Sequence, residues 1–273
     1  MRPFSDLARL SLNQMTTERW SVREAVEGCA RAGIPAIGLW RNKVAEAGLQ
    51  ESARLVRDAG LRVSSLCRGG MFPAATPTER GARIDDNRHA IDEAAELGTD
   101  VLVLVCGAAP DRDLGAARTM VAEGIAELVP YARERGVRLG IEPLHPMFAA
   151  DRSVIVTLAQ ANALAERFPA EQVGVVVDVY HVWWDPDLYG QIERAAERIL
   201  GFHVNDWIVP TPDLLLGRGM MGDGVIEIRR IRTAVDVAGY AGPIEVEIFN
   251  QAIWDTPGDA VLALMAERYL AHV

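Results

Sequence analysis

The sequence is poor in the residues that several common kinds of site require. It has three cysteines among 273 residues, Cys29, Cys67 and Cys106, which are far apart and form no Cys-x-x-Cys pair. A disulfide-stabilised fold or a cysteine-based zinc site is therefore not expected, and a reducing, cytoplasmic setting fits the chain best. The first dozen residues lack the apolar core of a signal peptide, and no run reaches the roughly 18 apolar residues of a membrane helix.

Positive charge is also scarce. Lys43 is the only lysine, and the 38 acidic residues outnumber the 28 Lys and Arg residues, so that the formal net charge is −10. Binding to phosphate-rich surfaces needs clustered cations. We therefore expect neither nucleic acid nor a membrane surface as a partner.

Short apolar runs alternate with longer amphipathic segments along the whole chain, which at 49% hydrophobic content is long enough for a large core. Eight strand–helix units without a linker predict a single (β/α)8 TIM barrel domain over residues 1–273. A doubly wound open sheet is the alternative, weakened by the absence of a Gly-x-Gly-x-x-Gly after the first strand. The expected strands span 7–13, 36–40, 61–67, 100–106, 137–142, 172–178, 200–206 and 243–249, and the main helices span 21–33, 49–60, 83–98, 114–135, 153–168, 191–199, 227–239 and 259–270.

Four consecutive strands of the second half carry a polar side chain near their ends. Glu142 ends the fifth strand, Asp178 ends the sixth, His203 lies in the seventh and Glu247 in the eighth. Active sites of TIM barrels form at the carboxyl ends of the strands, so these groups are expected at one rim. Three converging carboxylates would repel one another unless a cation lay between them. The pattern therefore predicts a metal site.

Strand alternation narrows the choice of ligands in the last two strands. Glu245 and Glu247 share one face, and we select Glu247 because it lies closer to the catalytic end. His203 shares its face with Asn205, while Asp206 faces the opposite way. Three oxygen ligands and one nitrogen favour Mn²⁺ first, and leave Mg²⁺, Co²⁺ and Zn²⁺ open.

The order of these residues on an eight-unit frame resembles the xylose isomerase-like barrel superfamily. That superfamily includes tagatose 3-epimerase-type sugar epimerases, hydroxypyruvate isomerase, inositol-catabolism dehydratases and endonuclease IV. The resemblance covers essentially the whole chain, and it implies that such a barrel forms oligomers. The string "VDVYH" matches the family's Asp-x-x-His arrangement, which implies that His181 contacts substrate beside Asp178.

Three longer strings, "EPLHPMFAADRSV", "HVNDW" and "DLLLGRGMMGDGVIEI", are similar to actinobacterial-type sugar phosphate isomerase/epimerase proteins. Among these are the larger subunits of C-glycoside deglycosidases, which cleave the carbon–carbon glycosidic bond of 3-keto-glycosides together with a small β-rich partner. The motifs do not separate a deglycosidase from a sugar isomerase or epimerase. Both functions imply a small keto-sugar or keto-glycoside as substrate.

Both functions begin with the same step. A metal ion chelated by a ketone oxygen and its neighbouring hydroxyl makes the adjacent C–H acidic, and a base removes the proton. In an epimerase, Glu142 and Glu247 would exchange protons with the substrate. In a deglycosidase, the proton would leave C2 and the aglycone would depart by β-elimination, with His145 as a separate base. Further candidates for contact with the substrate are Asn13, Trp40 and Phe72 after the first three strands, and Arg152, Asp206 and Arg218 in the second half.

Three rival functions are weaker. A Schiff-base aldolase needs a lysine inside the barrel, whereas Lys43 follows the second strand in a polar stretch. An endonuclease IV-like enzyme would need more histidine ligands and a basic face. A sugar-binding barrel without turnover is the rival from outside the enzymes, and it would tolerate Glu142→Gln.

Overall fold

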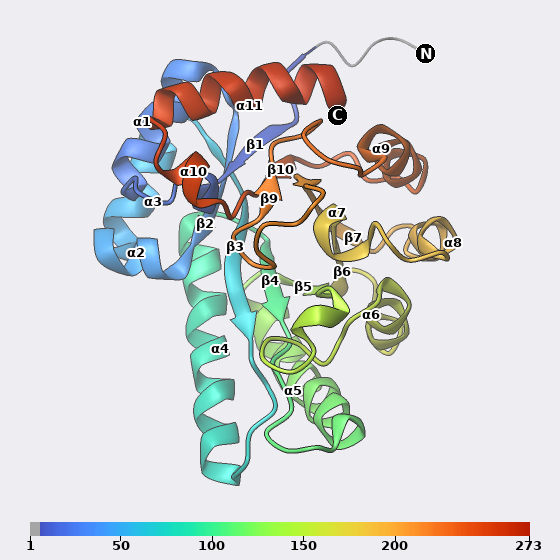
Figure 1. Cartoon of the computed structure of the whole chain (residues 1–273). Coiled ribbons are helices and arrows are strands. Elements are labelled where there is room, and N and C mark those ends of the chain that lie inside the picture. The colour runs from blue at the N-terminus through green and yellow to red at the C-terminus, as the bar shows by residue number, and fades with distance from the viewer. Residues whose placement is uncertain (1–5) are drawn as a thin grey trace.

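Eight strands close into a parallel barrel in the computed structural model, which describes residues 6–273 (Figure 1). Around the barrel the order is β1-β10-β7-β6-β5-β4-β3-β2, so β1 and β10 meet to close it. The expected TIM barrel is therefore confirmed. Residues 1–5, which belong to the expected domain and to the stretch expected to lack a signal peptide, lie outside the described residues. The strands are β1 (Leu10–Asn13), β2 (Ala36–Trp40), β3 (Arg62–Gly70), β4 (Val101–Val105), β5 (Arg138–Glu142), β6 (Val173–Asp178), β7 (Ile199–Val204) and β10 (Ile244–Val246).

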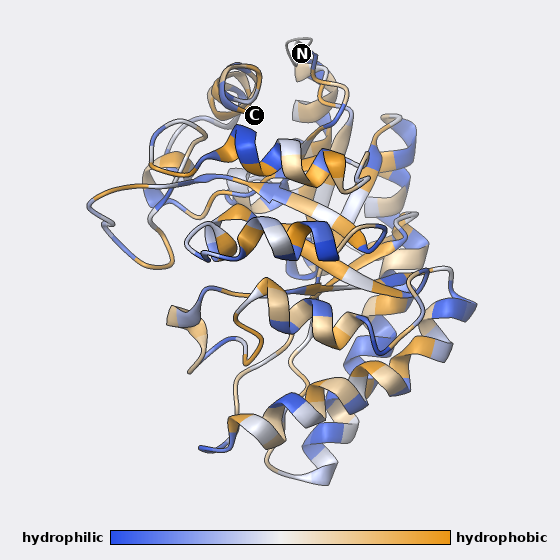
Figure 2. Cartoon of the chain, turned by 90° about the vertical axis from the view of Figure 1, so that its right-hand side faces the viewer, coloured by the Kyte–Doolittle hydropathy of each residue, from blue (hydrophilic) through white to orange (hydrophobic). Residues whose placement is uncertain are grey.

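Helices surround the barrel, and Figure 2 shows apolar segments along the central strands with mixed polar and apolar helices around them. None of the helices between residues 6 and 273 combines the length and apolar character needed to cross a bilayer. Short elements follow the carboxyl ends of several strands. They are η1 (Gln14–Thr17), η2 (Pro146–Phe148), α7 (Val179–Val182), α10 (Gln251–Trp254) and the hairpin of β8 (Asp206–Trp207) with β9 (Arg218–Gly219). The longer helices are α1 (Val22–Ala32), α2 (Arg41–Ala47), α3 (Leu49–Asp58), α4 (Pro77–Leu97), α5 (Leu114–Glu134), α6 (Leu158–Ala165), α8 (Leu188–Arg194), α9 (Ile228–Val237) and α11 (Gly258–His272).

Three helices differ from their expected bounds by three residues or more. Helix α8 spans Leu188–Arg194 rather than 191–199, and β7 already begins at Ile199. The other two differ at their first residue, which is set by local capping. Helix α4 begins at Pro77 rather than at residue 83, since Thr76 and Glu79 form a capping box and proline suits the first helical position. Helix α6 begins at Leu158 rather than at residue 153, where the side chain of Thr157 caps its first turn.

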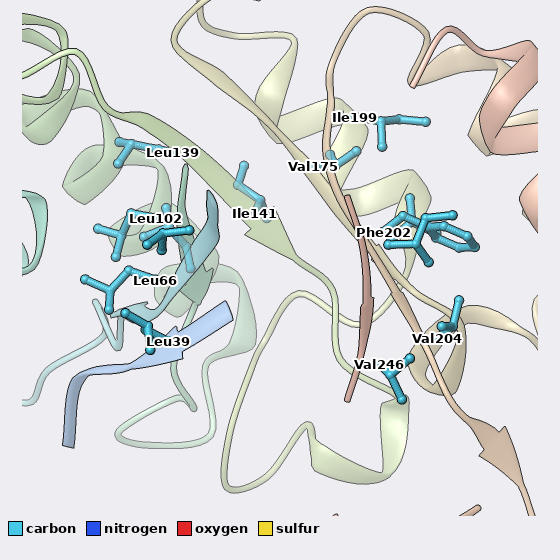
Figure 3. Close-up of a cluster of buried hydrophobic side chains, with 14 of the residues drawn as sticks. Leu39, Leu66, Leu102, Leu139, Ile141, Val175, Ile199, Phe202, Val204 and Val246 are labelled. Atoms are coloured by element: carbon cyan, nitrogen blue, oxygen red, sulfur yellow. The ribbon is translucent and has the colours of Figure 1, made fainter. Parts of the chain in front are cut away.

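The main core lies between strands and helices. Leu39, Leu66, Leu102 and Leu139 come from four adjacent strands, pair in register and are fully buried; Figure 3 shows their side chains next to one another. Burial of large aliphatic side chains of this kind contributes roughly 1.5–3 kcal/mol each. This layer holds the strands rigidly enough to position polar groups at their ends.

The inside of the barrel is more polar than this outer layer. The register of β3 shifts between its pairings with Ile37 and Gly38, and both Ser64 and Ser65 make contacts inside the barrel. A local irregularity of this kind re-aims side chains of a strand. Ser64 bonds to Ser11 at 2.8 Å, and Ser65 donates to the carboxylate of Glu245.

Candidate metal centre

The four predicted ligand residues lie together at the carboxyl ends of their strands. Glu142 and Asp178 are the last residues of β5 and β6, His203 lies in β7, and Glu247 directly follows β10. One ligand atom of each lies within 4.8 Å of those of the others, and all four side chains are buried. The alternation of β10 directs Glu247 into this cluster, while Glu245 lies one layer deeper in the barrel.

The donor atoms of this cluster fit a divalent cation. Nδ1 of His203 lies 3.3 Å from Oε1 of Glu142 and 3.9 Å from Oε2 of Glu247. Nδ1 of His203 and Oε1 of Glu142 are buried and make no hydrogen bond within the described part of the chain. Unpaired buried polar atoms are costly, and these converge on one point. Carboxylates with one imidazole are a donor set for Mn²⁺, Mg²⁺ or Zn²⁺.

A buried arginine balances part of the negative charge. Nη1 of Arg218 lies 2.7 Å from Oε2 of Glu247 and 2.9 Å from Oδ2 of Asp178. Its guanidinium carbon lies 4.6 Å from the ring centre of Tyr180 and 4.9 Å from that of Phe249. The β8–β9 hairpin brings Arg218 to this place, since β9 begins at this residue. Arg218 therefore belongs to the acidic cluster itself.

Burial and charge push the pKa values of the two neighbouring acids apart. Burial raises the pKa of Glu247 to about 8, even though Arg218 and His203 act against it. Burial would also raise the pKa of Asp178, but the charges of Arg218, His181 and His203 outweigh it and lower that pKa to about 2. Asp178 is thus the firmly ionised member of the pair.

The histidine of the cluster is held as a cation in the absence of a competing ion. Burial would lower the pKa of His203, but the carboxylates of Glu245, Glu142 and Glu247 raise it to about 10. A bound metal ion must displace this proton, because a ligating imidazole nitrogen is unprotonated.

A cavity of about 350 Å³ opens above the cluster. Glu142, Glu247 and Arg218 line its floor, and of the predicted substrate residues His181, Arg152 and Trp40 line it as well. The guanidinium of Arg152 lies over the ring of Phe148 at 5.4 Å. The remaining lining residues are Cys67, Arg68, Met71, Val105, Leu144, Phe148, Asp151, Leu215 and Phe249.

His181 is oriented by a hydrogen bond from the backbone of the loop after β5. Its Nδ1 accepts the backbone N–H of His145 at 3.1 Å, and its Nε2 lies 3.2 Å from Nη2 of Arg218. Burial lowers the pKa of His181 to about 3, so the ring is neutral near pH 7. A neutral imidazole beside Asp178 can bind a substrate hydroxyl without adding charge.

His145, the expected separate base, does not line the cavity. Its Nδ1 accepts the backbone N–H of Met147 at 3.2 Å, which caps the η2 turn. Its ring stacks on Trp207 with centres 5.2 Å apart and meets Trp184 edge-on. The structure gives His145 a role in orienting His181, and does not bring its ring to the residues that line the cavity.

Three other predicted substrate residues lie behind the lining. Asn13 donates to Glu245 at 3.0 Å and to Glu247 at 3.1 Å, so it supports the acids. Phe72 is buried against Gly124 of α5, where a Cβ would come within 2.4 Å of the ring. Asp206 accepts the backbone N–H groups of Gly222 and Ile226 and closes a loop.

Met71, the residue before Phe72, lines the cavity, whereas Phe72 does not. The φ of Met71, 56°, is in the left-handed region, which is uncommon for a residue other than glycine and turns the chain within one residue. Arg68 lines the cavity but was not among the predicted residues, although it directly follows the apolar run 61–67 and so lies at the end of the third expected strand.

The comparisons with known proteins agree with this architecture. The profile of the family described as "Xylose isomerase-like TIM barrel" matches residues 26–268. The crystal structure of protein SMc04130 from Sinorhizobium meliloti 1021 is 52% identical and superposes with a TM-score of 0.94 over 97% of this chain and 98% of that one. The structure of the IOLI protein with a binding zinc atom is 17% identical, with a TM-score of 0.84 over 96% and 97% of the two chains, and shows the fold alone.

Relatives of two kinds carry the names of enzymes. The 3-dehydroshikimate dehydratase of Pseudomonas aeruginosa is 28% identical over 256 residues, which are 90% of this chain. The chain spans only 39% of that protein's length. The L-ribulose-5-phosphate 3-epimerase UlaE of Escherichia coli is 22% identical over 76% of this chain and 71% of its own length.

Proposed function

Because the chain belongs to the xylose isomerase-like TIM barrel family, we propose that it is a divalent-metal-dependent enzyme that enolises a keto-sugar substrate. The observation that carries the proposal is the buried cluster of Glu142, Asp178, His203 and Glu247, two of whose members, Glu142 and Glu247, line a cavity. These four residues would hold the ion, with Mn²⁺ as the first choice for a site of three carboxylates and one imidazole. When bound, the ion would supply electrostatic stabilisation of the charge that develops on the ketone oxygen.

The chain's own residues would handle the proton. Glu142 and Glu247 both line the cavity, so each carboxylate can reach a C–H beside a ketone held there. Oε2 of Glu247 is bound to Arg218, whereas Oε1 of Glu142 has no hydrogen-bond partner among the described residues. We therefore assign the first proton abstraction to Glu142. His181 and Arg218 would hold substrate oxygens.

We favour elimination as the reaction that follows proton abstraction. The substrate would be a 3-keto-C-glycoside: the proton on C2 passes to Glu142, a C1–C2 double bond forms, and the bond from C1 to the aglycone breaks. The electron pair goes to the aglycone carbon, which takes up a proton returned by one of the two glutamates. Loss of a leaving group is also what the name of the dehydratase relative describes. An aromatic aglycone would suit Trp40, Phe148 and Phe249 in the cavity wall.

Epimerisation or isomerisation of a free ketose is the second candidate. It is favoured by the presence of two glutamates at the cavity, since return of the proton from the other carboxylate gives a product of changed configuration. The name of the UlaE relative describes such an activity for that protein. We further propose that a deglycosidase activity would require a small β-rich partner subunit, and that the barrel forms oligomers.

The test supplies both kinds of substrate to Mn²⁺-loaded protein. A 3-keto-C-glycoside and a free ketohexose are incubated separately in D₂O, and products are followed by chromatography and NMR. Release of the aglycone supports the lyase, and deuterium in a recovered or isomerised ketose supports the epimerase. Binding of either compound without exchange or product, with and without co-expressed partner candidates, would contradict the enzyme and leave the sugar-binding barrel.

A further inference from the structure

A second buried carboxylate lies directly below the proposed metal centre. Glu245 is 3% exposed and precedes Glu247 by two residues on the same inward face of β10. Its Oε2 accepts Nδ2 of Asn13 at 3.0 Å, and its Oε1 accepts the hydroxyl of Ser65 at 2.7 Å. Both donors are neutral. Burial of a carboxylate is costly unless a charged partner compensates it.

The barrel is shaped around this carboxylate. Gly38 of β2 leaves the room that Oε2 occupies, since a Cβ there would come within 2.2 Å of that oxygen. The irregular register of β3 lets Ser65 donate from the other side. In the sheet, Glu245 pairs in register with His203 of the neighbouring β7. Four strands, β1, β2, β3 and β7, therefore place neighbours around one acid.

The one ion-pair partner of Glu245 within 4 Å, in the part of the chain that the structure describes, is His203. Oε2 of Glu245 lies 3.6 Å from Nε2 of His203, a few tenths of an ångström beyond hydrogen-bond length. The other ring nitrogen, Nδ1, faces Glu142 and Glu247. Neither nitrogen has a hydrogen-bond partner among residues 6–273. The ring of His203 thus directs Nε2 toward Glu245 and Nδ1 toward the carboxylates of the metal centre.

We propose that Glu245 is a positioning residue that accepts the Nε2–H of His203 and so holds Nδ1 toward the metal ion. Histidine ligands commonly donate their second N–H to a carboxylate, which fixes the ring's orientation and tautomer, and removing this partner typically costs 10–100-fold in metal affinity. The inference rests on the metal centre of the proposed function, but not on which reaction follows. A carboxylate with no role toward the metal would leave affinity unchanged when altered.

The experiment measures the dissociation constant for Mn²⁺ by calorimetry in wild-type protein and two variants. Glu245→Gln keeps the shape of the side chain but removes its charge, and we expect binding about tenfold weaker. Glu245→Met removes the acceptor, and we expect binding 10–100-fold weaker. Ser65→Ala is the matched control, because it deletes a contact to the same carboxylate while leaving its charge beside His203; we expect a change of no more than about twofold.

A spectroscopic readout separates positioning from packing. In ¹⁵N-histidine-labelled protein loaded with Zn²⁺, which is diamagnetic, the Nε2–H of His203 should give a slowly exchanging imidazole proton, assigned by its absence in His203→Gln. We expect this signal to be lost in Glu245→Met and kept in Ser65→Ala.

The outcomes are distinguishable. Wild-type affinity and an unchanged imidazole signal in both Glu245 variants would overturn the role of Glu245 while leaving the metal centre intact. Wild-type protein that binds neither ion would overturn the metal centre and this inference together. If Glu245→Met does not fold, judged by circular dichroism, the comparison of Glu245→Gln with Ser65→Ala decides.

Discussion

The two halves of the barrel differ in what they bring to the cavity. Strands β5, β6, β7 and β10 supply all four residues of the candidate metal centre. Strands β1 to β3 supply Asn13, which supports the acids from behind, and the wall residues Trp40 and Arg68. The second half thus concentrates charge where a reaction needs it and also adds Phe148 and Phe249 to the lining, while the first half adds lining and supporting residues without a metal ligand. Changes in the acidic half should therefore affect catalysis and stability, whereas changes in the wall should affect substrate affinity.

The largest effect should come from removing the proposed base in the acidic half. Glu142→Gln keeps the size of the side chain but removes both the negative charge and the capacity to accept a proton. We expect kcat/KM for whichever of the two proposed substrates the protein turns over to fall by about 1000-fold or more, since general base and metal contact are lost together. Initial rates of the wild-type and variant proteins at several substrate concentrations give kcat/KM, and circular dichroism shows whether the variant is folded. Retention of a tenth of the activity would contradict the assignment.

The second largest effect should come from removing Arg218, the cation that balances the acidic cluster. Arg218→Met leaves Asp178 and Glu247 buried without their shared partner, and breaking such a pair typically costs about 3–5 kcal/mol. We expect a loss of about 3 kcal/mol in the free energy of unfolding of metal-free protein, measured by urea denaturation. Added Mn²⁺ should recover part of it, because a divalent ion replaces the missing charge.

Arg152→Met is the control for this measurement. Arg152 is 43% exposed and lies 3.8 Å from Asp151. Exposed ion pairs contribute at most about 1 kcal/mol, so this variant should keep nearly the wild-type stability. Equal losses in the two variants would mean that the acidic cluster has no special need of Arg218.

The acidic half should also make metal binding depend on pH. The pKa of His203 is raised to about 10 and that of Glu247 to about 8, so near pH 7 both carry a proton that the ion must displace. A group that loses a proton on binding weakens binding as the pH falls below its pKa. The dissociation constant for Mn²⁺ should therefore fall at least about tenfold per pH unit between about pH 6 and 8. Calorimetry in buffers of different ionisation enthalpy counts the protons released.

A pH-independent affinity would show that the cluster is already deprotonated without the ion.

The same raised pKa values also predict how the stability of the metal-free protein depends on pH. For His203 the folded pKa lies above its usual 6.5, so its contribution to metal-free stability is present below about pH 6.5 and is lost as the pH rises through about 10. The contribution of Glu247 to stability changes with pH in the same direction, and it is lost as the pH rises through about 8.

The sequence predicted the acidic half better than the wall, for a physical reason. Glu142 and Asp178 end apolar runs, and a parallel barrel brings all strand ends to one rim, so local pattern and topology were sufficient. The alternation in β10 placed Glu245 and Glu247 on one face but could not show how a second inward carboxylate is accommodated, since that depends on Gly38 and Ser65 of other strands.

Loop residues were harder to place because their positions depend on contacts distant in sequence. Arg218 enters the cluster only because the β8–β9 hairpin folds back over the barrel. His145 was expected to face the rim, but its ring caps its own turn and stacks on Trp207. At the end of β3, where Met71 has a positive φ, Met71 lines the cavity and the expected Phe72 is buried behind the lining.

The smallest effect should come from changing Trp40, a residue of the first half that lines the cavity. Trp40→Leu removes an aromatic face from the cavity, along with the hydrogen bond from its indole N–H to Asn13 at 2.9 Å. Stacking on an aromatic ring contributes about 0.5–1.5 kcal/mol beyond area burial, so we expect KM to rise about five- to tenfold with kcat nearly unchanged. Phe72→Leu is the matched control: it alters a buried ring behind the lining and should lower stability without changing KM. A fall in kcat for Trp40→Leu would mean that the wall reaches the acids through Asn13, and the division between the two halves would then have to be abandoned.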